Sequence, residues 1–499
     1  MEQIVKDFQE FLGEIRMYRQ MIAIVSFDAN TVAPKASIAV RAKRNGYFSK
    51  KIFEMATSEK MKGFLEALEP YKAELCDIAA AQYRLAKKNY DDSTKIPAQL
   101  IKEYSELTAK GNQAWEKARE DNDFDHFAPY LEQIVAKTKE MVAHRNTDRL
   151  HPYDVLLDDY EEGMTMKVYD EFFTKLRGTI VPLLKRIMDG GNQIDNSFMH
   201  QHVPIETQKK QAEFVAKKIG YDLERGYITH TTHPFCSGSH RTDVRITTRY
   251  DEKDFASSFY SILHECGHAI YEQGTGDDIA DTNLSRGTST GFHESQSRFY
   301  ENCIGRSREF WQYITQELKE YLPEGFANIT PEQFYMAANL VQPSLIRVEA
   351  DELTYSLHIM VRYEIERMLF NGEVEVRDLP ALWNKKYEEY LGITPPTDSL
   401  GVLQDIHWSW GYFGYFPTYS LGSAYAAQFL SYIRKEMDFD GLVGKGNFAA
   451  ITKWLNEKIH THGSKFTATQ LMEKMGGEQL NADYYCDYLQ SKFEKVYGL

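Results

Sequence analysis

The stretch that decides the fold is Asp254-Phe-Ala-Ser-Ser-Phe-Tyr-Ser-Ile-Leu-His264-Glu265-Cys-Gly-His268. Its apolar residues recur at three- and four-residue spacing, which predicts an amphipathic helix. Asp254 suits the N-cap of this helix, and Gly274 and Gly276 suit its end. We therefore predict one helix that begins after Asp254 and stops at these glycines.

The two histidines of this stretch predict a metal site. Residues four apart are neighbours on one face of a helix, so His264 and His268 can chelate a single Zn²⁺. Glu265 lies on the adjoining flank and can take a proton from a water on the metal. Cys266 points away from this face, and we expect it to pack in the core rather than bind the metal.

A catalytic zinc also needs a third protein ligand. Glu272 follows His268 by one turn, but three turns of one straight helix extend over about 12 Å and cannot converge on one ion. The pattern that adds a third histidine to the same segment fails here, because Tyr271 and Gly274 occupy its glycine and histidine positions. The ligand must therefore come from another element.

The remaining candidate is Glu294, in the segment Gly291-Phe-His-Glu-Ser-Gln-Ser297, which we read as a second helix. It would complete a site of two histidines and one glutamate. On spacing alone, a surface carboxylate is an equally good interpretation of Glu294. His293 could equally cap the helix or pack in the core.

One region interrupts an otherwise helical texture. Between about Tyr227 and Arg249, β-branched residues alternate with polar ones, which predicts a small sheet. The last strand comes directly before the metal-site helix, so an exposed sheet edge could hold an extended peptide by main-chain hydrogen bonds. The stretch Thr330-Pro-Glu-Gln333 reads as a capping box at another helix start.

Composition narrows the range of partners. The chain has 499 residues and a formal net charge of −15, with no cluster of Lys and Arg, which disfavours nucleic acid and anionic membranes. No apolar run approaches the length that a bilayer crossing needs. The first ten residues carry acids where a secretory signal carries basic residues, so we expect a cytoplasmic protein. The five scattered cysteines indicate reduced thiols.

Further segments accompany the predicted metal site in a fixed order. They are His233-Pro-Phe235, Asp243-Val-Arg-Ile-Thr247, His264-Glu-Cys-Gly-His268, His293-Glu-Ser-Gln-Ser297, Ile346-Arg-Val-Glu-Ala-Asp351 and Gly401-Val-Leu-Gln-Asp-Ile-His-Trp408. Together they closely resemble the carboxypeptidase Taq family of metallocarboxypeptidases. Similarity at Leu156–Tyr160 and Phe413–Tyr419 extends the resemblance over nearly the whole chain. The segment Phe27–Pro34 departs from the family's usual Trp-Asp-Gln start, which concerns local lid or subunit contacts and not the chemistry.

The resemblance implies a fold and an activity. The fold is mainly α-helical, similar to neurolysin and angiotensin-converting enzyme, with a deep cleft between two halves and a small sheet next to the active-site helix. Residues 1–499 form a single catalytic domain, usually in a homodimer. The activity is zinc-dependent release of single C-terminal residues from short peptides, with broad specificity. Co²⁺ or Mn²⁺ can replace Zn²⁺ in such a site.

The resemblance also assigns roles. His264, His268 and Glu294 hold the metal, and Glu265 is the general base. Arg347 binds the free carboxylate of the substrate, for which a guanidinium fork is well suited. From the residues alone, an ion pair between Arg347 and Asp351 one helical turn apart is the stronger interpretation.

Further substrate contacts are implied near the sheet and near the C-terminal segments. Arg245 resembles the family's determinant of substrate length, although a solvent-facing strand residue would look the same. His233 and Asp243 belong to the same substrate-binding region. Asp351 could orient a ligand histidine through its second ring nitrogen.

Neutral donors for the oxyanion and for the substrate carboxylate are expected after residue 400. His407 and either Tyr415 or Tyr419 are the candidates, and ordinary aromatic packing is the alternative for each tyrosine.

Two other functions remain open. An oligopeptidase or peptidyl-dipeptidase on a related scaffold would cleave differently placed bonds. A peptide-binding protein with a structural metal would have no use for Glu265, and its metal would be closed by a fourth ligand.

Overall fold

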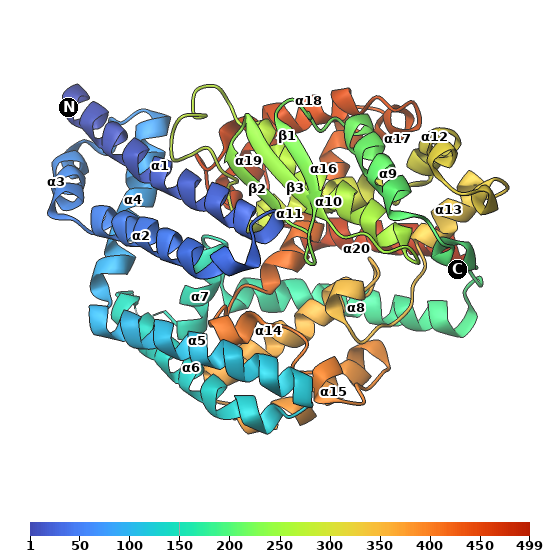
Figure 1. Cartoon of the computed structure of the whole chain (residues 1–499), viewed down its shortest axis with the longest axis horizontal. Helices are drawn as coiled ribbons and strands as arrows, with labels where there is room; N and C mark the ends of the chain where they lie inside the picture. Colours follow the sequence, from blue (N-terminus) through green and yellow to red (C-terminus); the bar gives the residue numbers. More distant parts are fainter. Residues whose placement is uncertain (149) are drawn as a thin grey trace. The chain divides into compact units, whose positions relative to one another are not determined.

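A computed structural model of the chain describes residues 1–148 and 150–499. The described part is mostly α-helical with one small sheet, as predicted (Figure 1). The chain forms two compact units. The first unit comprises Met1–Ser93, Asp195–Ala338 and Phe429–Gln479, and the second unit comprises Thr94–Ile194, Asn339–Gln428 and Leu480–Leu499. The predicted single domain with a cleft between two halves stays a prediction.

The first unit holds most of the shorter helices and the sheet. Its helices are α1 (Glu2–Thr31), α2 (Ile38–Ala56), α3 (Glu59–Leu68), α4 (Asp77–Lys95), α9 (Ile205–Lys218), α10 (Phe255–Gln273), α11 (Thr290–Arg298), α12 (Arg308–Leu318), α13 (Pro331–Ala338), α17 (Phe439–Gly444), α18 (Phe448–Lys458) and α19 (Ala468–Gly476). The last residues of α4 belong to the second unit. A π-helical turn, Phe299–Ile304, follows α11 directly.

The second unit is built mainly from longer helices. They are α5 (Ala98–Asp121), α6 (Phe124–Arg145), α7 (Pro152–Tyr160), α8 (Met166–Gly190), α14 (Tyr355–Asn371), α15 (Leu379–Leu391) and α20 (Ala482–Tyr497). Helix α16 (Pro417–Glu436) begins in this unit and ends in the first. Within the second unit, α5 packs along α6, α8 along α20, and α14 along α15.

The sheet lies in the predicted region and has the order β1-β3-β2, with β1 (Gly226–His230), β2 (Cys236–His240) and β3 (Asp243–Thr248). Strand β3 pairs in parallel with β1 and antiparallel with β2. Strand β3, which leads into α10, is therefore the central one, and its main chain is paired on both sides. An added peptide strand would have to pair with β1 or β2.

Alternation along β3 separates its two faces. Val244 and Ile246 are fully buried, and β3 packs against α10. Arg245 projects from the opposite face and lies over the ring of Phe27, with its guanidinium carbon 5.2 Å from the ring centre. The sheet thus covers the metal-site helix on one face and presents an arginine on the other.

Helix α10 has the predicted limits. The Asp254 side chain accepts a hydrogen bond from the backbone N–H of Ser257 at 3.2 Å, as an N-cap does. Gly274 is the C-cap. Helices α9 and α11 and strand β3 pack against α10, and most of its side chains are buried. The predicted capping box is also present, because Thr330 and Gln333 exchange side-chain and backbone hydrogen bonds.

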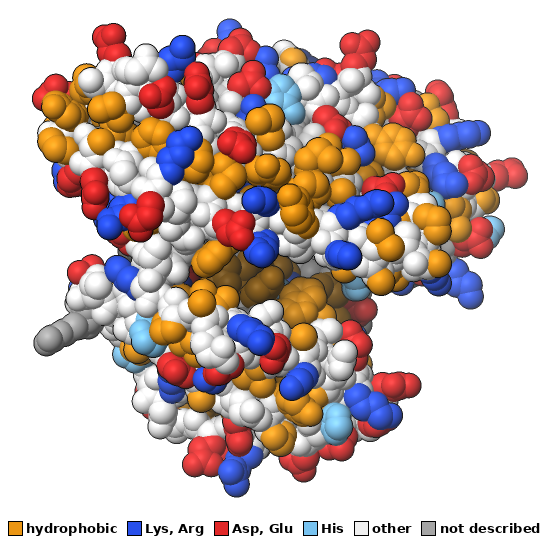
Figure 2. All heavy atoms as spheres, turned by 60° about the vertical axis from the view of Figure 1, so that its left-hand side comes forward, with side chains coloured by type: hydrophobic (Ala, Val, Ile, Leu, Met, Phe, Trp, Pro, Cys, Tyr) orange, Lys and Arg blue, Asp and Glu red, His pale blue; other side chains and the backbone are white. Residues whose placement is uncertain are grey.

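The surface carries side chains of both charges. Figure 2 shows acidic and basic side chains interspersed over the visible face. Among the described residues, no helix combines the length and the apolar character that a membrane crossing requires.

Candidate active site

Three side chains of the first unit converge in the predicted way. One ligand atom from each of His264, His268 and Glu294 lies within 4.8 Å of the other two. The Oε2 atom of Glu294 is 3.6 Å from Nε2 of His264 and 3.5 Å from Nε2 of His268. Two imidazole nitrogens and one carboxylate oxygen directed at a common point form a donor set that suits a divalent transition metal.

The carboxylate of Glu294 is held so that one oxygen faces the histidines. Its other oxygen accepts a hydrogen bond from Nε of Arg298 at 2.7 Å, one turn later on α11. Burial alone would raise the pKa of Glu294, but the positive charge of Arg298 and the contacts with the two imidazoles lower it well below its usual range. The group therefore stays ionised and available as a ligand.

A second acid backs one of the histidines. Oε2 of Glu301, in the π-helical turn after α11, lies 2.8 Å from Nδ1 of His264. Burial opposes ionisation of Glu301, yet Arg298, His264 and Arg306 together lower its pKa to about 2. A carboxylate in this position fixes the ring of His264 so that Nε2 faces Glu294. The second ring nitrogen of His268 has a different partner, Nδ1 of His293 at 2.6 Å.

Gly267, between the two histidines, allows α11 to approach α10 closely. A Cβ atom at this position would lie 2.7 Å from Cα of Ser297 and 2.8 Å from the carbonyl carbon of Gln296. Both are backbone atoms of α11, the helix that carries Glu294. The absence of a side chain at Gly267 thus permits the close approach of the helix that carries Glu294.

Glu265 follows His264 directly and interacts electrostatically with His264 and Glu294. It is only 6 % exposed. Burial raises its pKa to about 7, opposed by the charge of His264 and assisted by that of Glu294. A carboxyl group with this pKa can accept and return a proton near neutral pH.

In the second unit, Arg347 is held by an acid that the sequence analysis did not single out. Asp405 accepts from Nε and Nη2 of Arg347 at 3.1 and 2.9 Å, and from Nε of Arg362 at 2.6 Å. Burial would raise the pKa of Asp405, but the two guanidinium groups lower it far below its usual range. The carboxylate therefore fixes both arginines.

The suggested ion pair between Arg347 and Asp351 is absent from these contacts, because the chain forms only a short 3₁₀ turn at Arg347–Glu349. The Asp351 carboxylate accepts instead from the backbone N–H groups of Gln342, Leu353 and Thr354 and from the Thr354 hydroxyl. The acid that contacts Nδ1 of His264 is Glu301, whereas the sequence had suggested Asp351 for a contact of this kind.

His407 and the two predicted tyrosines form one cluster with Arg347. The His407 ring is 5.5 Å from the ring of Tyr415 and 6.4 Å from that of Tyr419, measured between centroids. The guanidinium carbon of Arg347 lies 4.9 Å from the centre of the Tyr419 ring. Burial lowers the pKa of His407 to about 4, assisted by Arg347 and Arg362 against Asp405, so the imidazole is neutral at pH 7. The cluster offers neutral donors beside a fixed cation.

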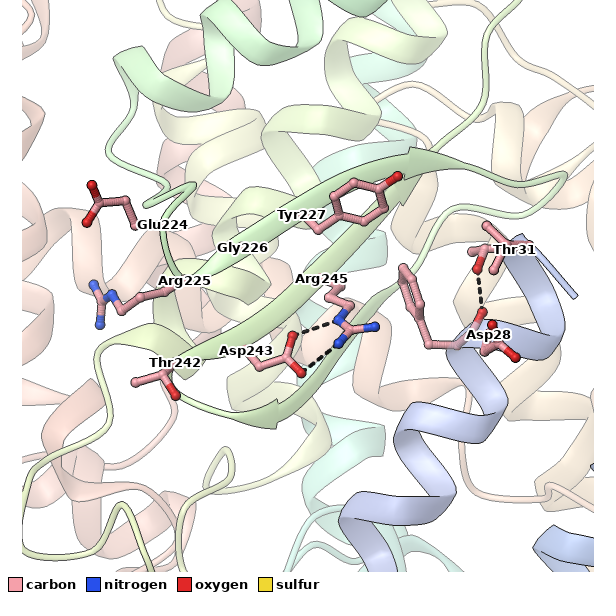
Figure 3. A pocket seen from close by; sticks show the side chains of 11 residues that line it. Asp28, Thr31, Glu224, Arg225, Gly226, Tyr227, Thr242, Asp243 and Arg245 are labelled. Carbon is pink, nitrogen blue, oxygen red and sulfur yellow. Dashed lines mark hydrogen bonds and ion pairs between the residues drawn. The ribbon is translucent and has the colours of Figure 1, made fainter.

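Arg245 lines an open pocket of about 380 Å³ in the first unit, between the end of α1 and the sheet (Figure 3). Its guanidinium pairs with both carboxylate oxygens of Asp243, at 2.6 and 2.8 Å. The side chain of Arg245 is thus held between the Asp243 carboxylate and the ring of Phe27. His233 is exposed in the loop between β1 and β2.

Sequence patterns could have indicated some of the residues that were not predicted. Glu301 follows Glu294 by seven residues, so helical periodicity alone places it near the same face. Asp405 precedes His407 by two residues in a segment already noted for its family resemblance. A glycine in mid-helix, as at Gly267, costs stability and so suggests a close packing contact.

Comparison with known proteins gives a consistent result. The family model described as carboxypeptidase Taq (M32) metallopeptidase matches residues 7–493. Carboxypeptidase 1 of Bacillus subtilis is 44% identical over 495 residues, which are 99% of this chain and 99% of that protein. Thermostable carboxypeptidase 1 of Thermus thermophilus is 36% identical over 100% of this chain and 99% of that protein.

Solved structures show the same fold. The M32 carboxypeptidase of Deinococcus radiodurans superposes with a TM-score of 0.95 at 33% sequence identity, with all of both chains covered.

Proposed function

Because the chain belongs to the carboxypeptidase Taq (M32) family and is a metallocarboxypeptidase, we propose that it uses zinc to release single C-terminal residues from short peptides. We further propose broad specificity for the residue released. Residues 1–499 act as one catalytic domain, and the active form is a homodimer. The expected cytoplasmic location stays a prediction.

The observation that carries the proposal is the convergence of His264, His268 and Glu294. The donor set fits a divalent metal, since Nδ1 of His264 is occupied by Glu301 and its Nε2 is directed towards Glu294. These three residues would hold the metal. When bound, Zn²⁺ would lower the pKa of a water towards 7 and polarise the scissile carbonyl.

The chain's own groups then carry the remaining steps. Glu265 accepts a proton from the attacking water and passes it to the leaving amine. Arg347, fixed by Asp405, pairs with the carboxylate at the end of the substrate. His407, which is neutral, and Tyr415 or Tyr419 donate hydrogen bonds to the developing oxyanion or to that carboxylate.

We further propose that Arg245, paired with Asp243, limits peptide length, and that His233 contacts the peptide backbone. The pocket beside Arg245 supports this role, because it offers a fixed charge next to an open space. Short peptides are the expected substrates.

The test of the catalytic role is Glu265→Gln, which keeps the size of the side chain and removes the base. We expect normal zinc content, measured by metal analysis, and loss of nearly all turnover, because a general base typically contributes 10²–10⁴-fold. Near-normal activity in a zinc-loaded variant would reject the role of Glu265.

Product analysis tests the activity itself. A dipeptide with a blocked N-terminus should yield one free amino acid, and chelation of the metal should stop the reaction. Cleavage only at internal bonds of longer peptides would favour an oligopeptidase. Zinc binding without any hydrolysis would favour a peptide-binding protein.

A further inference from the structure

The two proposed histidine ligands are supported in different ways on their far sides. Nδ1 of His264 contacts a carboxylate, that of Glu301, at 2.8 Å. Nδ1 of His268 contacts another imidazole, with 2.6 Å to Nδ1 of His293. Nε2 of His293 in turn lies 3.1 Å from Oε1 of Glu272.

We propose that His293 and Glu272 form a relay that positions His268 for metal binding. The relay rests on the proposed metal site and adds two positioning residues to it. Neither residue is itself a proposed ligand. Its members come from two helices, since His268 and Glu272 lie on α10 and His293 on α11.

A single arrangement of protons satisfies every contact in the relay. A neutral imidazole that offers Nε2 to a metal carries its proton on Nδ1, so His268 must donate from Nδ1. Nδ1 of His293 must then accept, which leaves the proton of His293 on Nε2. That N–H donates to the carboxylate of Glu272, which can only accept. The chain of donors runs in one direction and ends on a negative charge.

The surrounding backbone leaves room for both relay side chains. A Cβ atom at Gly287 would lie 2.6 Å from Cδ2 of His293, and one at Gly238, on β2, would overlap the carboxylate of Glu272. The rings of His268 and His293 are 4.6 Å apart between centroids, and Tyr271 lies 5.3 Å from His293. The side chains of His293 and Glu272 are therefore packed closely by neighbouring residues.

The relay predicts unequal support for the two histidines. A hydrogen bond to a carboxylate is roughly twice as strong as one between neutral groups. His264 receives the former directly from Glu301, and His268 receives it only through His293. Loss of Glu301 should therefore weaken metal binding more than loss of Glu272.

His293 immediately precedes Glu294, so its substitution could disturb the third ligand without any relay. Glu272 avoids this ambiguity, because it sits on the other helix and contacts His293. A double-mutant cycle between Glu272→Gln and His293→Leu separates the two explanations. If Glu272 acts through His293, its effect disappears once His293 is leucine.

The experiment measures zinc affinity by competition with a chelator, for the wild type, each single variant and the double variant. Loss of a group that orients a ligand typically weakens metal binding 10–100-fold, which we expect for His293→Leu. His293→Gln should recover part of this loss, because an amide can both accept and donate. Glu272→Gln should have a smaller effect alone and none in the leucine background. His200→Gln, an exposed histidine of the first unit, is the control and should bind zinc normally.

Unchanged affinity in His293→Leu, or effects of the two substitutions that simply add, would overturn the relay. Gly238→Ala provides an independent check if His293→Leu does not fold, since it displaces the Glu272 carboxylate alone. We expect it to reproduce the loss seen in Glu272→Gln, and wild-type affinity would contradict the relay. Failure of the proposed function would appear separately, as wild-type protein that binds zinc but does not hydrolyse blocked dipeptides.

Discussion

The substitution Gly267→Ala tests how the third ligand is brought to the two histidines. It adds one methyl group between His264 and His268 and changes none of the proposed ligands. The added Cβ would lie 2.7 Å from Cα of Ser297 and 2.8 Å from the carbonyl carbon of Gln296. These are backbone atoms, so a side-chain rotation cannot relieve the contact.

The size of the effect follows from these distances. Non-bonded carbon atoms sit about 3.5–4.0 Å apart, so α11 must retreat from α10 by about 1 Å. Glu294 lies on α11 and moves with it, whereas metal–ligand distances tolerate only about 0.2 Å. We expect zinc affinity to fall at least about tenfold. Overpacking of this kind should also lower the free energy of unfolding by about 1–3 kcal/mol.

Chelator competition measures the affinity, and urea unfolding of the metal-free protein measures the stability. The matched control is Gly63→Ala on α3, where an added Cβ meets no atom within 4 Å. That change should raise stability by roughly 0.5–1 kcal/mol, because alanine is the better helix former, and leave zinc binding unchanged. Wild-type zinc affinity in Gly267→Ala would refute the argument that this glycine sets the distance to Glu294.

Three further predictions concern the residues around the proposed substrate site. Asp405→Asn leaves two buried arginines without their shared carboxylate and should lower the free energy of unfolding, measured with urea, by about 3–5 kcal/mol. Asp440→Asn, which breaks an exposed ion pair, is the control and should lower it by less than about 1 kcal/mol. Because burial lowers the pKa of His407 to about 4, the unfolded chain gains a proton near pH 6.5 that the folded protein does not, and stability falls as the pH drops from 7 to 5. His407→Gln should remove on the order of 2 kcal/mol of this fall, and an identical pH profile would argue against a buried neutral imidazole. Arg245→Ala should broaden the range of peptide lengths cleaved, measured by kcat/KM over a peptide series, and an unchanged preference would assign Arg245 to the sheet surface alone.

The fold was predictable where local chemistry decides it. Asp254 and Gly274 marked the limits of α10, and alternation of β-branched residues marked the sheet. The order of the strands was not predictable in this way. Parallel pairing of β1 with β3 places the last strand in the centre, and this depends on long-range packing against α10 that no local pattern encodes.

The candidate site likewise contains residues that the sequence predicts and residues that it does not. The two histidines one turn apart follow from helix periodicity, and so does Glu265 beside them. The partner of Arg347 does not, because Asp405 is 58 residues further along the chain. Spacing suggested Asp351 as the partner of Arg347. The Asp351 carboxylate is near in sequence, but it accepts hydrogen bonds from Thr354 in the local turn instead. The four-residue spacing would pair Arg347 with Asp351 only in an α-helix, and this segment forms only a short 3₁₀ turn.

The proposed third metal ligand, Glu294, shows why a short motif does not define a whole site. His264 and His268 fix two directions, but the distance to Glu294 depends on how closely two helices approach. That approach is permitted by Gly267, one of the two positions in the segment to which we assign neither metal binding nor proton transfer. A glycine in the middle of a helix costs roughly 1 kcal/mol relative to alanine, so its presence there requires a compensating contact. The contact is with the backbone of α11. This close packing of the two helices places the Glu294 carboxylate next to the histidines.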